Sequence, residues 1–150
     1  MPWRQDRMRV SVEQCGPITI LRCSGTHACT DEDHANDCEL STRLADGLRD
    51  GDGRFILDVR DLDVVYPSGM ADIFNPWLPA ATGPNAENAA RVVILWKPVQ
   101  GHRKGWRWAQ WKRYLARALQ CVTDEREALA LLTSSEPRAA AAKASDKIQP

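Results

Sequence analysis

The chain has 150 residues, of which 43% are hydrophobic and 27% charged, and its 20 basic side chains balance its 20 acidic ones. This length and composition are typical of one globular domain, and they exclude a chain that is disordered throughout or embedded in a membrane. Because the net charge is zero, no overall field attracts nucleic acid or anionic lipid, and a charged partner must be recognised locally.

The first predicted elements form a β-hairpin followed by a helix. Apolar and polar residues alternate from Met8 to Glu13, which indicates an edge strand. A Gly-Pro turn then leads to a second strand over Ile18–Leu21, which Gly25 closes. From about Asp33 to Arg49, leucines recur every four residues and predict a helix with one apolar face.

The middle of the chain predicts two buried strands, over Phe55–Val59 and Val92–Trp96. Short, nearly continuous apolar runs of this kind are typical of parallel strands that helices cover on both faces. Between them we expect a short helix after Tyr66–Met70 and a surface loop over residues 82–90. This order of elements implies right-handed crossover connections.

The last third of the chain predicts two helices separated by a short strand. Tryptophans and leucines three and four residues apart indicate a helix over about Arg103–Leu119, and a strand at Cys121-Val122 precedes the final helix. Beyond Thr133 there are too few large apolar residues to join a core. We therefore predict an α/β domain over residues 8–133, with an N-terminal hairpin plus parallel strands in a mixed sheet and about four helices, and a disordered tail over residues 134–150.

The lack of a recognisable targeting signal and the pattern of cysteines predict a cytoplasmic protein. The amino terminus lacks the apolar stretch of a signal peptide, and no later run is long enough to suggest a membrane-spanning helix, so we expect no membrane insertion. The five cysteines form an odd set without a CxxC pair. This pattern favours reduced thiols, most of which act as small hydrophobic side chains.

The element order, and above all the segment Phe55–Met70 (FILDVRDLDVVYPSGM), resembles the STAS domains of anti-sigma factor antagonists. The segment is similar to the family's hydrophobic strand and acidic turn that lead into Asp-Ser-Ser-Gly-Leu, and Ser68 lies where the family has its phosphorylatable serine. The resemblance covers roughly residues 8–133. It implies a regulatory module that binds an anti-sigma factor or another kinase-like regulator, with phosphate on Ser68 blocking the complex.

The resemblance also implies a partner-binding surface. Its members are the residues around Ser68 and one residue at the acidic start of the first helix, namely Tyr66, Pro67, Ser68, Gly69, Met70 and Asp31. An acidic patch of this kind can steer a basic partner, and opposite charges elsewhere on the neutral chain also permit self-association.

Three residues depart from the family pattern at this surface. Tyr66 and Ala28 stand where the family has carboxylates, and Pro67 replaces the first serine of the motif. Three interpretations therefore stay open. Ser68 is switched by phosphorylation, or it is only a helix N-cap in a constitutive adaptor, or the chain is the STAS subunit of a lipid-transport ATPase assembly.

Four side chains that can ligate metal, His27, Cys29, His34 and Cys38, fall within twelve residues. His34 and Cys38 are four residues apart, which places them on one helical face. The spacing of the set matches no standard structural zinc pattern. We therefore expect no metal and no other cofactor, while a metal- or nucleic-acid-binding domain stays open as a further alternative function.

Two further patterns bear on the class of function. Six Lys or Arg residues lie between His102 and Arg117 among aromatic side chains, as in some nucleic-acid and membrane-surface segments. Since the apolar residues keep one helical stripe, we interpret the basic ones as its solvated face, with Trp106 the exposed ring, and expect no nucleic-acid partner. No phosphate-binding loop, nucleophile elbow or zinc-protease motif occurs, so we do not expect an enzyme.

Overall fold

A computed structural model describes residues 7–51, 53–98 and 105–133 of the chain. The side chains of Pro67 and of residues 105–109 lie outside this description, and so does the predicted tail over residues 134–150. The predicted exposure of Trp106 therefore concerns a side chain that the structure does not describe.

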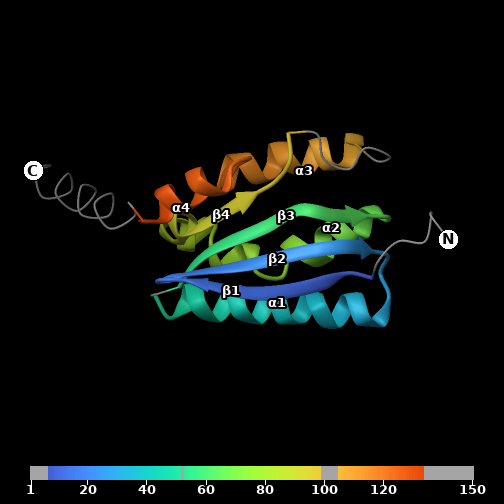
Figure 1. The fold of residues 1–150 in the computed structure, drawn as a ribbon, viewed down its shortest axis with the longest axis horizontal. Helices are drawn as coiled ribbons and strands as arrows, with labels where there is room; N and C mark the ends of the chain where they lie inside the picture. Colours follow the sequence, from blue (N-terminus) through green and yellow to red (C-terminus); the bar gives the residue numbers. More distant parts are fainter. Residues whose placement is uncertain (1–6, 52, 99–104, 134–150) are drawn as a thin grey trace, which may run out of the picture.

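The sheet has five strands in the order β1-β2-β3-β4-β5 (Figure 1). The hairpin strands β1 (Arg9–Cys15) and β2 (Ile18–His27) are antiparallel. The remaining strands, β3 (Arg54–Val64), β4 (Val92–Leu95) and β5 (Gln120–Val122), continue the sheet in parallel. The predicted α/β fold with an N-terminal hairpin and parallel strands is confirmed.

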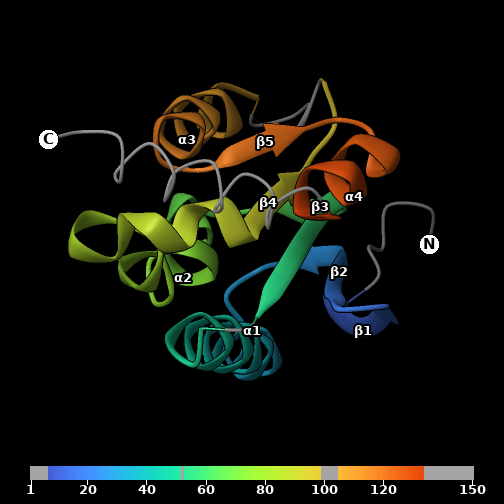
Figure 2. The ribbon, with the colours of Figure 1, turned by 90° about the vertical axis from the view of Figure 1, so that its left-hand side faces the viewer.

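Three helices cover one face of the sheet, as Figure 2 shows in a view along it. They are α1 (Asp31–Arg49), α2 (Pro67–Phe74) and α3 (Gly105–Ala118). The 3₁₀ helices η1 (Leu78–Ala80) and η2 (Gly83–Arg91) connect α2 to β4. The leucines of the predicted stripe on α1 are buried in this main core, together with residues of α2 and the inward side chains of β2, β3 and β4.

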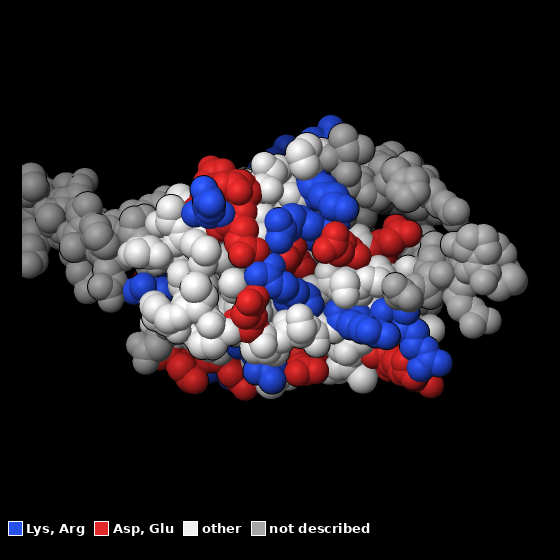
Figure 3. Space-filling view, viewed as in Figure 1, with Lys and Arg blue, Asp and Glu red and all other residues white. Residues whose placement is uncertain are grey.

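The opposite face of the sheet is covered by α4 (Glu125–Thr133), whose Ala128 and Leu132 pack on Ile18, Ile20 and neighbouring apolar side chains. Beyond this smaller core the face carries charged groups of both signs, which lie close together in Figure 3. Among them, Arg22 and Arg60 both form ion pairs with Asp58 and with Glu125 at the start of α4.

Three predicted boundaries were wrong. β2 does not close at Gly25 but runs on to His27. Gly25 has a positive φ of 81°, yet it still pairs with Leu62 of β3, and the pairing continues to His27 and Val64. The expected acidic turn after Val59 is the second half of β3, and the loop expected over residues 82–90 lies within the 3₁₀ helix η2.

The cysteines are free, as expected, but most of them are not core residues. Cys23 alone among them is buried, whereas Cys15 and Cys38 are exposed and Cys29 and Cys121 are half-buried. Burial accounts for the raised pKa of the Cys23 thiol. The interpretation of most cysteines as small hydrophobic side chains was therefore wrong.

Within the described ranges, none of the helices combines the length and the apolar character needed to cross a lipid bilayer.

Candidate functional site

The candidate site lies where β2 and β3 end and α1 and α2 begin, at the right of Figure 1. Because β2 and β3 are parallel, their carboxyl ends meet at one edge of the sheet, and the helices that follow them start side by side. This edge is where ligands commonly bind in sheets with parallel strands.

Ser68 is exposed at the second residue of α2. The N-cap of this helix is Tyr66, Pro67 occupies the first helical turn, and no side chain makes a capping hydrogen bond. The alternative that Ser68 serves as the N-cap was therefore wrong. Its hydroxyl instead lies 3.6 Å from the thiol of Cys29, in the loop that precedes α1.

The other expected partner-binding residues divide into an exposed and a buried group. Asp31 is exposed at the first residue of α1, and the side chain of Tyr66 is 51% exposed. Gly69 and Met70 are buried, and Met70 belongs to the main core. Among the expected residues whose side chains the structure describes, Tyr66, Ser68 and Asp31 are therefore exposed, and Gly69 and Met70 are buried.

The start of α1 is fixed by a capping box that the sequence analysis did not find. The hydroxyl of Thr30 accepts a hydrogen bond from the Asp33 backbone amide, and the Asp33 carboxylate accepts one from the Thr30 amide and one from the Ala28 amide. Burial alone would raise the pKa of Asp33, but these hydrogen bonds outweigh it and lower the pKa. Asp33, at the acidic start of the first helix, is thus a buried structural group and not part of an exposed patch.

His27, the last residue of β2, is fully buried and its Nε2 lies 2.8 Å from Oδ2 of Asp37 on α1. Burial favours the neutral ring, but the hydrogen bond and the charge of Asp37 outweigh this effect and raise the pKa of His27. The second oxygen of the Asp37 carboxylate, Oδ1, is buried and has no hydrogen-bond partner. Polar atoms buried in this way are uncommon in folded proteins.

Cys29 connects these groups to Ser68. Its backbone has a φ of 58°, a left-handed conformation that few residues with a side chain adopt. This turn places the thiol 3.9 Å from Nδ1 of His27 and 3.9 Å from Oδ2 of Asp72 on α2. Cys29 is therefore in reach of side chains from two elements, β2 and α2.

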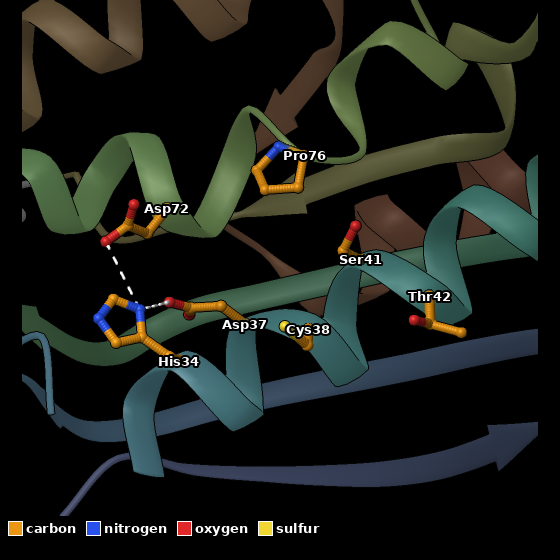
Figure 4. Close-up of a pocket in the computed structure, with 7 residues that line it drawn as sticks. All are labelled: His34, Asp37, Cys38, Ser41, Thr42, Asp72 and Pro76. Carbon is orange, nitrogen blue, oxygen red and sulfur yellow. Dashed lines mark ion pairs between the residues drawn. The ribbon is translucent and has the colours of Figure 1, made fainter. Parts of the chain in front are cut away.

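A hollow of about 280 Å³ opens beside this group, between α1 and α2 (Figure 4). In Figure 4 the ring of His34 points between Asp37 and Asp72, and its Nδ1 lies 4.0 Å from an oxygen of each carboxylate. Both aspartates line the hollow, together with side chains of α1 and one proline, namely His34, Cys38, Ser41, Thr42 and Pro76.

The structure brings together a different set of ligating side chains from the one expected. His34 and Cys38 do share one face of α1 and line the hollow, and His27 and Cys29 lie beside it. Asp37 and Asp72 complete the group, and the sequence analysis assigned neither to it. Asp72 lies far along the chain and no spacing rule connects it to His27, so only the packing of α2 against α1 could have indicated it.

The described part of the basic helix α3 is consistent with a solvated face. Lys112 donates hydrogen bonds to the carbonyls of Lys97 and Pro98 and lies over the ring of Trp96, whereas Arg113 and Arg117 are exposed. Trp111 packs against the main core and stacks on Phe74.

Comparisons with protein-family models and with curated proteins find no match to this chain.

Proposed function

We propose that this chain is a protein-binding regulatory module of the anti-sigma factor antagonist type. Its docking surface, as we define it, consists of Tyr66, Ser68 and Asp31, which the structure exposes at the beginnings of α1 and α2. The mixed sheet with an N-terminal hairpin agrees with the STAS resemblance at the level of fold. The protein works by binding a cytoplasmic anti-sigma factor or kinase-like regulator, and it is not an enzyme.

The observation that carries this proposal is the position of Ser68. Its hydroxyl is exposed at the second residue of α2, directly beside the loop that leads into α1. Phosphate at this position adds about two negative charges. They would lie one helical turn from Asp72 and close to the acidic start of α1, so phosphorylation would change the charge of the docking surface without disturbing the core.

The charge around the docking surface favours a partner with a basic face. Asp31 and Glu32 are exposed in the first turn of α1. Exposed charges of one sign steer a complementary partner and raise its association rate, and this effect weakens as salt increases. We therefore propose that the part of the partner facing the start of α1 carries lysine or arginine, whereas the part covering Ser68 is uncharged, so that a phosphate on Ser68 would be buried without a counter-charge and would break the complex.

Affinity capture with three forms of the protein tests the proposal: the wild type, Ser68→Ala and Ser68→Asp. We expect the wild type and Ser68→Ala to retain an anti-sigma factor of the histidine-kinase fold, identified by mass spectrometry, and Ser68→Asp to lose it. Ser11→Asp is the matched control, because it adds the same charge to an exposed residue of β1.

Equal binding of all four forms would contradict the switch and leave a constitutive adaptor. Retention of a lipid transporter's ATPase in place of an anti-sigma factor would replace the proposed partner. Phosphate transferred by the captured kinase to residues other than Ser68 would also contradict the proposal.

A further inference from the structure

Three side chains from three different elements converge beside the hollow. They are His27 at the end of β2, Asp37 on α1 and Asp72 on α2, and one ligand atom of each lies within 4.8 Å of the others. We propose that these residues bind a Zn²⁺ ion, with His34 as the fourth ligand. This inference is independent of the proposed docking function.

Three distances between these ligand atoms can be compared with those of a tetrahedral zinc site. With metal–ligand bonds near 2.0–2.1 Å, neighbouring ligand atoms are about 3.4 Å apart. Asp37 Oδ2 is 2.8 Å from Nε2 of His27 and 4.0 Å from Nδ1 of His34, and Asp72 Oδ2 is also 4.0 Å from Nδ1 of His34. These three distances lie on either side of the distance of about 3.4 Å that separates ligand atoms in a tetrahedral zinc site. His34 is about half exposed, so its side chain can make the small rotation required.

The unpaired oxygen of Asp37 is an independent sign that this site binds a cation. Oδ1 is buried without a hydrogen-bond partner, in a side chain that lines the hollow. A buried carboxylate oxygen without a partner is destabilising, whereas coordination to a metal would satisfy it. His27 does not satisfy Oδ1, since its Nε2 is bonded to the other oxygen, Oδ2. A zinc ion would replace the proton between His27 Nε2 and Asp37 Oδ2, and the Asp37 carboxylate would bind it through both oxygens.

The types of donor select zinc over magnesium or calcium. Imidazole nitrogens and carboxylate oxygens suit zinc, whereas magnesium and calcium prefer oxygen ligands alone. The thiol of Cys29 lies 3.9 Å from Asp72 Oδ2 and adds a further donor that zinc accepts. The hollow also gives an ion access from solvent, because His34 and Asp72 are both partly exposed.

A bound ion would join the end of β2 to α1 and α2. The two helices already pack against each other, but among the described residues no salt bridge other than the 4.0 Å approach of His34 to Asp72 links α1 to α2. Zinc would therefore stabilise this edge of the sheet more than the core beneath it.

Zinc titration of the purified, tag-free protein tests the proposal, with a chromogenic chelator as competitor and metal analysis for stoichiometry. We expect one Zn²⁺ per chain. His34→Ala and Asp72→Asn should each weaken binding by at least about tenfold. The matched control Glu39→Gln, an exposed carboxylate on α1, should bind as the wild type does. With Co²⁺ in place of Zn²⁺, we expect the visible absorption bands of tetrahedral coordination.

Both substituted residues are partly exposed, so the variants should keep the fold, and circular dichroism checks this. Two results would overturn the proposal. The first is a wild type that takes up no stoichiometric zinc at micromolar concentration. The second is a folded His34→Ala/Asp72→Asn double variant that binds zinc as tightly as the wild type. Neither result bears on whether Ser68 controls a protein partner.

Discussion

Gly69 lies directly against the buried ring of His27. A β-carbon at this position would be 2.8 Å from Nδ1 of His27 and 2.7 Å from Cγ1 of Val64, closer than such atoms approach in folded proteins. Both neighbours are buried, so neither can move away freely. Only glycine allows α2 to pack this closely on the end of β2.

Substitution of Gly69 by alanine should therefore destabilise the protein. Overpacking typically costs about 1–3 kcal/mol, and the better helix propensity of alanine offsets up to about 1 kcal/mol of it. We expect a net decrease of about 1 kcal/mol or more in the free energy of unfolding, measured by urea denaturation. Ser68→Ala, at the neighbouring exposed residue, should change it by less than about 0.5 kcal/mol. Equal effects of the two substitutions would show that the contact is not tight.

Individual residues of the site differ in how far the sequence could predict them. Ser68 follows a strand and a proline and precedes a glycine, and its exposure was predictable from that position. The burial of Asp33 and Asp37 was not predictable from the sequence, because both residues occur in an acidic run that is typical of a solvated helix face. Their partners are backbone amides of the preceding loop and a histidine at a strand end, which are in contact only in the folded chain.

At the scale of single elements, α1 depends on its capping box. Thr30 and Asp33 satisfy amide groups at the helix start that would otherwise lack partners. Thr30→Ala should lower the free energy of unfolding by about 1 kcal/mol, the usual value of such a cap, as measured by chemical denaturation.

Thr42→Ala is the control for this substitution, because Thr42 is exposed inside the same helix. It should be neutral or slightly stabilising, since alanine has the better helix propensity. If Thr30→Ala were as neutral as Thr42→Ala, then the capping hydrogen bonds would contribute no stability.

The strands show why element type was predictable and element length was not. The apolar run at Phe55–Val59 predicted the first half of β3 correctly. Beyond it, the register of β2 and β3 shifts: Arg22 pairs with Asp58, but Ser24 pairs with Asp61. This bulge inserts one residue into β3 and brings Leu62 and Val64 to the core, which breaks the period-two pattern that a sequence reading relies on.

At the scale of the whole molecule, the ion pairs around Asp58 hold the second face of the sheet together. Burial alone would raise the pKa of Asp58, but hydrogen bonds and charge from Arg60, with the contribution of Arg22, outweigh it and lower the pKa. The hydrogen bond from Arg22 also lowers the pKa of Glu125, which connects this network to α4.

Both shifts predict a loss of stability in acid. A carboxyl whose pKa is lower in the folded state stabilises the protein above its unfolded pKa, and this contribution is lost as the pH falls through the folded pKa. We expect the free energy of unfolding to decrease between about pH 5 and pH 2. Asp58→Asn should be less stable than the wild type at pH 7, and the difference should shrink toward low pH.

Urea denaturation at a series of pH values measures this effect. Asp46→Asn, at an exposed residue of α1, is the matched control, and its stability should follow that of the wild type at every pH. A difference between Asp58→Asn and the wild type that stayed constant down to pH 2 would contradict the role of the ionised carboxylate.

The assembly of the candidate site is also a property of the whole molecule. The order of strands and helices was sufficient to predict which ends of β2 and β3 meet, and therefore where α1 and α2 begin. It could not predict that the ring of His34 lies between two aspartates from different helices. That contact depends on how α2 packs against α1, for which the sequence carries no periodic signal.

The two faces of the sheet are covered by different numbers of helices. The main core is covered by three helices, whereas the smaller core is covered by α4, a helix of nine residues. A helix this short does not persist in water by itself, so its amide hydrogen bonds last only while Ala128 and Leu132 remain packed. Local unfolding should therefore begin there, and α4 should exchange its amide hydrogens before α1 does. Each such opening would expose a strip of isoleucine and valine on an otherwise charged face, while the docking edge and the hollow beside it stay intact.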